Sequence, residues 1–451
     1  MASPQQEFPE AYEICKQFTL TEDQMFEVVD RLTKEIEMGL RKETNLRSTV
    51  KCYITYVQDV PSGKERGKYL ALDLGGSNFR VLLVDLKSQT DVDIQSKSFV
   101  LGKNLLTGSG KRLFDYIAEC LAEFCIEQRI AWDNLPLGFT FSFPCKQTAI
   151  NKGVLVNWSK GFKCPDVVGH NVVQMLQQAI DSRLDLRVRV VAILSDTTGT
   201  LMACAQRQPN CRIGLIVGNV CNACYIEKTE NTEMFQRYQT SRKRNMIVNC
   251  EWGSFGDNGV LDFIRTSYDK SMDQLTPDPM MQTFDKCISG VYLGEIVRQI
   301  VLDLMKKNVI FKGLMSQAIQ TEWKFESRFI AEIESEPFGQ YRSTAMVLNS
   351  LGIRTCNEKD LACLRYICES VTRRSAQLVA CGLVCLIRKM NVCKSSVGID
   401  GGMYRYHPNY HRLLIENMNI LLKCSAEYEL VLSEDGSGRG AALVAAIYSC
   451  K

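Results

Sequence analysis

Residues 70–84 read as an apolar strand, an acid, two glycines, a short polar step and a second apolar strand. This pattern predicts a hairpin whose tip holds phosphate. Asp73 can bind a metal ion directly or through water, and Gly75 and Gly76 let backbone N–H groups approach phosphate oxygens without a Cβ in the way. The predicted nucleotide-facing set is Asp73, Leu74, Gly75, Gly76, Ser77, Asn78 and the cationic Arg80. An ordinary tight hairpin is the alternative, because Gly-Gly is a common turn dipeptide.

A second segment repeats the first. Residues 214–226 again read strand, glycine, polar step and strand, with Asn219 in the polar step. We interpret the pair as an internal duplication, one phosphate-facing hairpin in each of two lobes, with a nucleotide clamped between them. A chance likeness between two turns is the alternative.

A third glycine-rich segment lies near the C-terminus. Residues 428–433 form a predicted strand, followed by a loop that contains Ser437 and then by an alanine-rich helix. A strand, a glycine loop and a helix N-terminus together form an anion cradle. The spacing matches neither GxGxxG nor GxxxxGK[ST], so the dinucleotide and P-loop fingerprints do not apply.

A candidate general base follows a buried strand. The run 187–194 is continuously apolar, as expected of a strand covered on both faces, and Ser195 and Asp196 come directly after it. Ligands of open α/β sheets gather at the carboxyl ends of strands. A carboxylate there can take the proton from an attacking hydroxyl. The alternative, that Asp196 caps the helix beginning near Thr197, is compatible with this role.

Further polar side chains suit a polyol, which needs many directional hydrogen bonds. Ser142 and Lys160 stand in two such segments, each with flanking aromatic residues. The remaining candidates are Asn222, Glu251, Gln282 and Asp285. Taken singly, each has a solvated or structural alternative.

The elements that must position these residues alternate between strands and helices, which indicates an α/β fold. Residues 21–40 predict a helix, because Thr21 and Gln24 have capping-box spacing before an apolar 3.6-residue period. A chain of 451 residues exceeds what one hydrophobic core usually serves, so two lobes are expected.

The composition excludes several classes of protein. Lys and Arg total 54 against 51 Asp and Glu, which gives no electrostatic case for nucleic acid or an anionic membrane. The twenty cysteines are scattered through apolar segments and are expected to be reduced thiols. The first ten residues lack the features of a secretory signal, and no apolar run approaches a membrane span of about 20 residues. We therefore expect a cytoplasmic (cytosolic) protein.

Five motifs resemble the eukaryotic hexokinases, including glucokinase. They lie at residues 70–80, 137–145, 158–163, 251–259 and 433–442. The resemblance runs from about Thr21 to the C-terminus. It implies an actin-like ATPase (ribonuclease H-like) fold with two lobes and a central cleft. The implied small lobe is 62–194 and the large lobe 1–61 and 195–451, with the helix after about residue 436 packing back on the small lobe.

The resemblance also implies phosphoryl transfer from MgATP to the 6-hydroxyl of a hexose such as glucose, the first step of glycolysis, by a monomer. It makes Asp196 and Lys160 catalytic. The implied sugar ligands are Ser142, Ser159, Lys160, Ser195, Asp196, Asn222, Glu251, Gln282 and Asp285. On the nucleotide side it implies the first hairpin, Asn219, Gly401, Gly402 and Ser437. Mg²⁺ would arrive with ATP, with at most a water-mediated contact to Asp73.

The chain departs from the family pattern at several of these positions. The family usually has Thr at the positions of Ser77 and Ser159, Asn at that of Ser195, Glu at that of Asp285, and Gly-Thr-Gly at 218–220. A β-branched Val220 resists a positive φ, so we expect weak ATP binding that Asn219→Thr with Val220→Gly would restore. The alternative function is a catalytically impaired, sugar-binding sensor or regulator. An actin- or chaperone-like ATPase would share the fold but leave the sugar-side residues unexplained.

Overall fold

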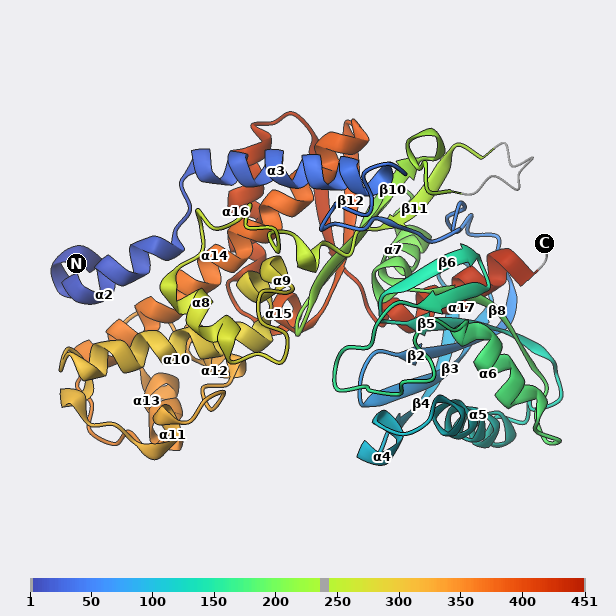
Figure 1. Cartoon of the computed structure of the whole chain (residues 1–451), viewed down its shortest axis with the longest axis horizontal. Coiled ribbons are helices and arrows are strands. Elements are labelled where there is room, and N and C mark those ends of the chain that lie inside the picture. The colour runs from blue at the N-terminus through green and yellow to red at the C-terminus, as the bar shows by residue number, and fades with distance from the viewer. Residues whose placement is uncertain (1–2, 236–242, 450–451) are drawn as a thin grey trace.

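The computed structural model of the chain describes residues 3–235 and 243–449. Residues 1–2, 236–242 and 450–451 of the expected large lobe therefore lie outside the described residues. The structure contains two main sheets, each with helices on both faces (Figure 1). The first sheet has the order β4-β3-β2-β5-β8. Its strands are β2 (Gly67–Leu74), β3 (Asn78–Leu86), β4 (Val92–Val100), β5 (Leu135–Phe141) and β8 (Val188–Leu194).

The second sheet has the order β1-β11-β10-β9-β12-β13. Its strands are β1 (Tyr53–Ile54), β9 (Cys211–Val217), β10 (Cys221–Lys228), β11 (Asn245–Asn249), β12 (Lys394–Asp400) and β13 (Glu427–Leu432). Apart from β1, it repeats the first sheet: three antiparallel strands, then two parallel strands added beside the first of them. The predicted internal duplication is confirmed, and each copy carries one of the two hairpins.

Two helices lie between the sheets, each directly after the last strand of its copy. They are α7 (Asp196–Arg207) and α17 (Gly436–Ser449). They pack backbone to backbone, since a Cβ at Gly440 would stand 2.0 Å from the carbonyl oxygen of Gly199. Helix α17 also lies on the first sheet, where a Cβ at Gly138 would stand 2.1 Å from the carbonyl oxygen of Ala441. The lobe boundaries at residues 62 and 194 stay a prediction.

The outer faces of the sheets are covered by longer helices (Figure 1). Helices α5 (Gly110–Glu127) and α6 (Val172–Asp181) cover the first sheet, and α3 (Glu22–Leu40), α14 (Glu358–Met390) and α16 (Tyr410–Leu422) cover the second. The capping box at Thr21 and Gln24 is confirmed at the start of α3. Among the described helices, α14 alone is long and apolar enough to cross a membrane, yet 94% of its apolar window is buried, as in a core helix.

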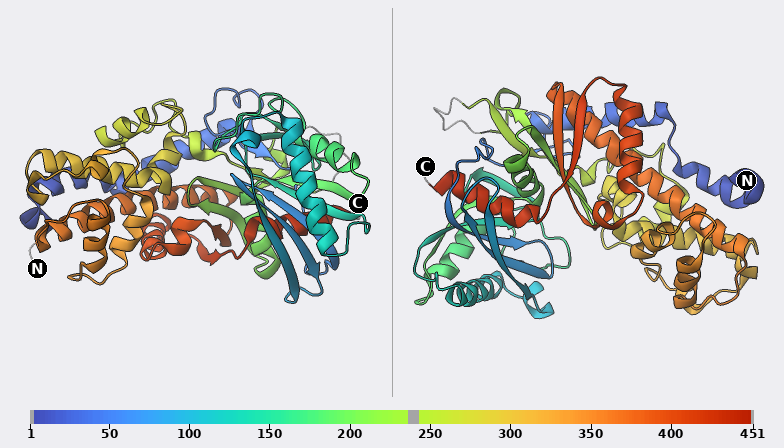
Figure 2. Two further views of the ribbon diagram at one scale, coloured as in Figure 1. Left: turned by 90° about the horizontal axis from the view of Figure 1, so that it is seen from below. Right: turned by 180° about the vertical axis from the view of Figure 1, so that it is seen from behind.

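The end of the molecule farthest from the C-terminus is a helical cluster (Figure 2). Its larger members are α2 (Pro9–Cys15), α8 (Ser267–Gln274), α10 (Gly290–Lys306), α12 (Ser327–Glu334) and α13 (Arg342–Ser350). The short elements are α1 (Pro4–Glu7), α4 (Lys103–Leu106), α9 (Thr283–Ile288), α11 (Gln317–Gln320), α15 (Gly402–Tyr406), β6 (Cys145–Ala149), β7 (Lys152–Leu155), η1 (Lys16–Phe18), η2 (Thr229–Asn231), η3 (Trp252–Ser254) and η4 (Phe311–Gly313).

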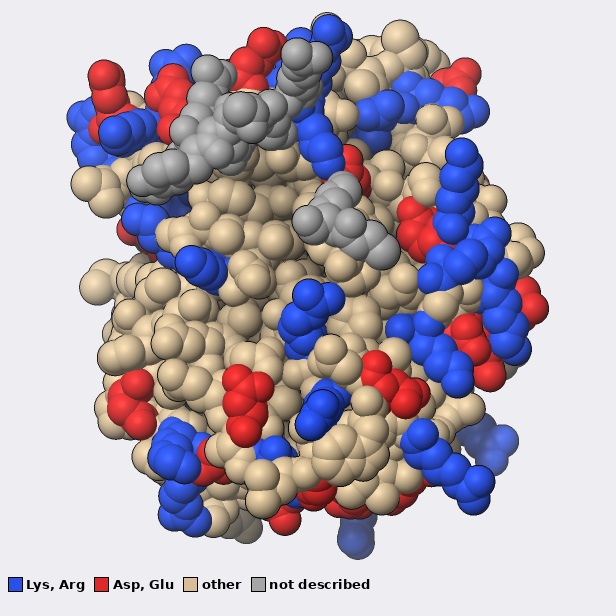
Figure 3. All heavy atoms as spheres, turned by 90° about the vertical axis from the view of Figure 1, so that its right-hand side faces the viewer, with Lys and Arg blue, Asp and Glu red and all other residues tan. Residues whose placement is uncertain are grey.

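The cysteines agree with the sequence interpretation. Those of the described residues are all free, and most are buried, Cys393 and Cys424 being the exposed ones. Within residues 3–235 and 243–449, no three His, Cys, Asp or Glu side chains gather as a metal site. On the face shown in Figure 3, basic and acidic residues are interspersed among uncharged ones.

Candidate active site

Asp196 is the first residue of α7, and Ser195 is its N-cap. Ser195 Oγ accepts from the backbone N–H of Thr198 at 3.3 Å and lies 2.8 Å from the hydroxyl of Thr197. Asp196 Oδ1 accepts from the backbone N–H of Thr197 at 2.8 Å. The N-cap is therefore Ser195, whose hydroxyl is used in the capping hydrogen bond. Asp196 is the first residue of the helix and is not its cap.

Two charged side chains from separate segments, Lys160 and Asp73, act on Asp196. Burial raises the pKa of Asp196, the ammonium of Lys160 lowers it, and the carboxylate of Asp73 raises it again. Lys160 Nζ donates to the carbonyl oxygen of Ser142 at 2.8 Å. The Ser142 hydroxyl also opposes the rise in the pKa of Asp196. The predicted base, the predicted catalytic lysine and the acid of the first hairpin thus belong to one site.

The segment that carries Lys160 rests on a cluster of aromatic rings. The rings of Trp158 and Phe162 are stacked at 5.0 Å, and the ring of Phe143 lies 4.8 Å from that of Trp158. Trp158 Nε1 donates to the carbonyl oxygen of Cys164 at 2.7 Å. Lys160 itself takes a left-handed φ of 56°. The cluster holds Lys160 in an uncommon conformation, with its side chain and that of Ser159 exposed.

On the second sheet, an amide and carboxylate cluster combines Asn222 with Glu251. Asn222 Nδ2 donates to Glu251 Oε1 at 2.8 Å, and Asn249 Nδ2 donates to the same oxygen at 2.8 Å. Burial raises the pKa of Glu251, and the hydrogen bond from Asn249 opposes the rise. Asn249 is missing from the sequence prediction, although its place two residues before Glu251 at the end of β11 was a usable signal.

Gln282 and Asp285 lie at the start of α9. Gln282 is exposed, and its Nε2 donates to the hydroxyl of Ser254 at 2.7 Å. Asp285 is 5% exposed, and burial raises its pKa to about 6 against the hydrogen bond from Ser289. Lys160 also lowers the pKa of Asp285, so both acids of the second sheet side, Glu251 and Asp285, lie within its electrostatic reach.

The first hairpin is joined to the start of α17. Asp73 pairs with Arg80 across β2 and β3, and Arg80 Nη2 lies 2.9 Å from Asp73 Oδ2 and 2.6 Å from Asp435 Oδ1. Ser437 Oγ donates to Asp73 Oδ2 at 2.6 Å. The charge of Arg80, predicted to face the nucleotide, is therefore shared with two carboxylates here.

The tip of this hairpin is open as predicted for a phosphate cradle. A Cβ at Gly76 would meet no atom within 4 Å, and Ser77 and Asn78 are exposed. Leu74 differs, because its side chain is fully buried in the core of the first sheet. Only the backbone of Leu74 is available at the tip, and its carbonyl oxygen accepts from the N–H of Ser142 at 3.1 Å.

The second hairpin turns at residues 218–220 against two neighbouring backbones. The N–H of Gly290 donates to the carbonyl oxygen of Gly218 at 2.8 Å. Gly401 has a φ of 115°, and a Cβ there would stand 2.3 Å from the carbonyl oxygen of Val217, so this position requires glycine. Neither Asn219 nor Val220 has a positive φ. The turn of this chain therefore closes without the left-handed conformation at either position, and the expected weak binding of ATP stays a prediction.

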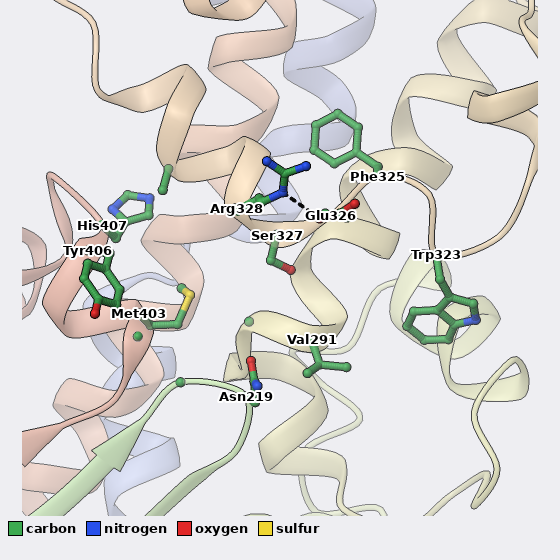
Figure 4. A pocket seen from close by; sticks show the side chains of 14 residues that line it. Asn219, Val291, Trp323, Phe325, Glu326, Ser327, Arg328, Met403, Tyr406 and His407 are labelled. Carbon is green, nitrogen blue, oxygen red and sulfur yellow. Dashed lines mark hydrogen bonds and ion pairs between the residues drawn. The ribbon is translucent and has the colours of Figure 1, made fainter. Parts of the chain in front are cut away.

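A pocket of about 490 Å³ opens beside this hairpin (Figure 4). Asn219 and Gly218 line one side, and Gly402 with Met403 and Tyr406 lines another. Val291 lies beside Asn219, and Trp323, Phe325 and the polar Ser327 are among the residues that line the side farther from the hairpin (Figure 4). Such a volume suits a small molecule with an apolar, planar part. The sequence prediction missed this farther side, because nothing in residues 323–328 resembles a known fingerprint.

Two family models match the chain, both described as hexokinase, over residues 10–206 and 212–447. The chain is 38% identical over 443 residues to Hexokinase type 1 of Drosophila melanogaster, covering 98% of this chain and 95% of that protein. The chain belongs to the hexokinase family. It is 43% identical to Hexokinase-1 of Mus musculus over 96% of this chain but 45% of that protein. The chain thus spans about half the length of the mammalian hexokinases it matches.

Solved hexokinases share the whole fold. The hexokinase of Schistosoma mansoni complexed with glucose matches with a TM-score of 0.91 and 38% identity, over 99% of this chain and 100% of that one. A second hexokinase crystal structure matches with a TM-score of 0.83 and 28% identity. The predicted family and actin-like ATPase fold are therefore confirmed.

The negative φ of Val220 changes what its replacement should do in this hexokinase family member. We expect Val220→Gly alone to leave kcat/KM for ATP within about twofold, and to lower the free energy of unfolding by about 1 kcal/mol through added backbone freedom in the unfolded chain. Steady-state kinetics and urea unfolding measure both. A large gain in kcat/KM would show that valine distorts the hairpin after all.

Proposed function

We propose that this chain is an ATP-dependent hexokinase, a phosphotransferase with an alcohol acceptor, which phosphorylates glucose or a related hexose at the 6-hydroxyl. One observation carries the proposal. Asp196 lies within the electrostatic reach of Lys160, of Asp73 in the first hairpin, and of Glu251, which accepts a hydrogen bond from Asn222. This grouping supports a role for Asp196 as the general base, with polyol ligands on one side and a phosphate-facing turn on the other, as phosphoryl transfer to a hydroxyl requires.

The chain's own residues supply positioning and proton transfer. Asp196 accepts the proton of the 6-hydroxyl as that oxygen attacks. Glu251 accepts hydrogen bonds from sugar hydroxyls, while the amides of Asn222 and Asn249 hold its carboxylate in place. Lys160 stabilises the negative charge that develops in the transition state, and its ammonium lowers the pKa of Asp196, which favours the ionised form. ATP, when bound, would supply the phosphoryl group, and the Mg²⁺ ion that accompanies it would offset the negative charge of the phosphates.

The residues present fit a nucleotide. The open tip of the first hairpin, with Gly76, suits phosphate oxygens, and the pocket beside Asn219 and Gly402 suits the nucleoside part. Ser437 and Asp73 lie side by side at the phosphate end. A single carboxylate such as Asp73 suits a Mg²⁺ ion that keeps most of its waters. We further propose that the protein acts as a cytosolic monomer in glycolysis.

A coupled assay with purified protein, ATP, Mg²⁺ and a panel of hexoses tests this function. We expect hexose 6-phosphate to form in proportion to ADP. Hexose binding without turnover would instead support the sensor or regulator alternative. ATP hydrolysis that ignores the sugar would support an actin- or chaperone-like ATPase.

Sugar binding is expected to bring the two lobes together. Ser142 and Lys160 belong to the first sheet side and Asn222 and Glu251 to the second, so one hexose must contact both. Small-angle scattering should then give a smaller radius of gyration with saturating glucose than without it. Identical profiles at demonstrated occupancy would contradict closure.

A further inference from the structure

Asp285 has a partner that a sugar ligand does not need. Its Oδ1 accepts from the backbone N–H of Cys221 at 2.6 Å and from the hydroxyl of Ser289 at 2.5 Å. Cys221 is the first residue of β10, directly after the turn of the second hairpin. The buried carboxylate therefore holds the outgoing strand of that hairpin.

The incoming strand is held from the same place. Ser289 precedes α10, and the next residue, Gly290, donates its N–H to the carbonyl oxygen of Gly218 at 2.8 Å. Residues 285–290 thus form hydrogen bonds to both ends of the turn, Gly218 and Cys221. Because the two bonds bracket Asn219 and Val220, they set the position of the hairpin tip beside the pocket.

The hydroxyl of Ser289 supports Asp285. Ser289 occupies the N-cap position of α10, where a serine side chain usually accepts from a backbone N–H. In this structure its side chain makes no capping bond and donates to Asp285 instead. Because the hydroxyl of Ser289 bonds to Asp285 in place of a capping bond, we infer that the carboxylate of Asp285 has a specific role.

Asp285 also lies close to the segment that carries Glu251. A Cβ at Gly253, two residues after Glu251, would stand 3.3 Å from the Cβ of Asp285. The absence of a side chain at Gly253 thus leaves room for Asp285 beside the segment that carries Glu251, so a shift of that segment is expected to reach Asp285. The shorter side chain of aspartate, where the family usually has glutamate, keeps the carboxylate close to the backbone of α9 and within reach of Cys221.

We propose that Asp285, supported by Ser289, is a positioning residue that couples the hexose side of the site to the second phosphate-facing hairpin. The proposal rests on the proposed hexokinase function for its kinetic consequences but not for its structural ones. It predicts that loss of either side chain weakens the use of ATP, although neither is needed to contact the nucleotide.

The experiment compares Asp285→Ala, Asp285→Asn and Ser289→Ala with wild type. Three quantities are measured: KM for ATP at saturating glucose, glucose affinity from tryptophan fluorescence, and hydrogen exchange of peptides covering β9 and β10. We expect Asp285→Ala to raise KM for ATP about tenfold, the effect of losing a charged hydrogen bond, and Ser289→Ala about threefold. Both should speed exchange in the hairpin.

Two variants separate positioning from simple sugar binding. Asparagine at 285 keeps an oxygen that can accept from Cys221, so Asp285→Asn should keep hairpin exchange near wild type while glucose affinity falls. Ser375→Ala is the matched control, because that buried hydroxyl donates to the neighbouring Ile288 carbonyl at 2.7 Å and does not touch Asp285. It should change neither KM for ATP nor hairpin exchange.

The outcomes are decisive in each case. Unchanged hairpin exchange in both Asp285→Ala and Ser289→Ala overturns the proposal, and a fall in glucose affinity alone would leave Asp285 as a sugar ligand only. If wild type forms no hexose phosphate, the proposed function fails. The exchange data still decide whether Asp285 positions the hairpin.

Discussion

Replacing Asp196 by alanine is expected to lower kcat by about 10²–10⁴ while glucose binding stays largely intact, the usual range for loss of a positioned general base. The physical reason is the place of Asp196 at the N-terminus of α7, where burial raises its pKa and Lys160 lowers it. Steady-state kinetics give kcat, and tryptophan fluorescence with glucose gives the affinity. Wild-type turnover in the variant would remove Asp196 from the mechanism.

Asp196→Asn serves as the control for folding. Its side-chain oxygen can still accept from the backbone N–H of Thr197, the bond that Asp196 Oδ1 makes at the start of α7. The variant therefore keeps the helix end but loses the base, and we expect the same loss of kcat. Recovery of activity in Asp196→Asn would mean that the alanine acted by disturbing α7 rather than by removing a base.

Replacing Lys160 by methionine is expected to lower kcat/KM for ATP by about 10²–10³, the range for losing one donor to a developing charge. A second effect follows from the same ammonium. Burial raises the pKa of Asp196 and Lys160 lowers it, so loss of Lys160 leaves that pKa higher. A base works only when ionised, so activity should disappear at a higher pH on the acid side. The pH profile of kcat/KM from pH 4.5 to 8 measures the shift.

Lys160→Arg is the matched control, because it keeps a positive charge over the ring of Phe143 but changes the geometry of the donor. We expect its acid limb to stay near that of wild type even where kcat falls. An acid limb that does not move in Lys160→Met would show that the titrating group is not Asp196.

Much of this site could be predicted from the sequence, because the signals are local. The alternation of apolar and glycine-rich segments predicted both hairpins, and the buried run before Ser195 placed Asp196 at the end of a strand. The duplication of the two sheets followed from the likeness of 70–84 to 214–226, and the structure repeats strand order and direction in both copies. These features depend on periodicity and chain order, which a sequence records directly.

Other properties of the site depend on residues far apart in the chain. Whether Val220 must adopt a positive φ is decided by how the turn packs against Gly290 and Gly401, and the packed turn needs none. The sequence gives no partner for Arg80. In the structure, the segment just before α17 places Asp435 Oδ1 2.6 Å from Arg80 Nη2.

The hydrogen bonds of Asp285 are the clearest case of a property that depends on residues far apart in the chain. The spacing and type of Asp285 indicate a polar ligand, and only the meeting of α9 with β10 reveals that its carboxylate holds the backbone of Cys221. By itself, the sequence of this protein determined the family, the duplicated fold and the residue types available for chemistry. The tertiary structure decided which oxygen and which N–H meet, because hydrogen-bond partners and backbone torsions in a turn are set by packing between distant segments.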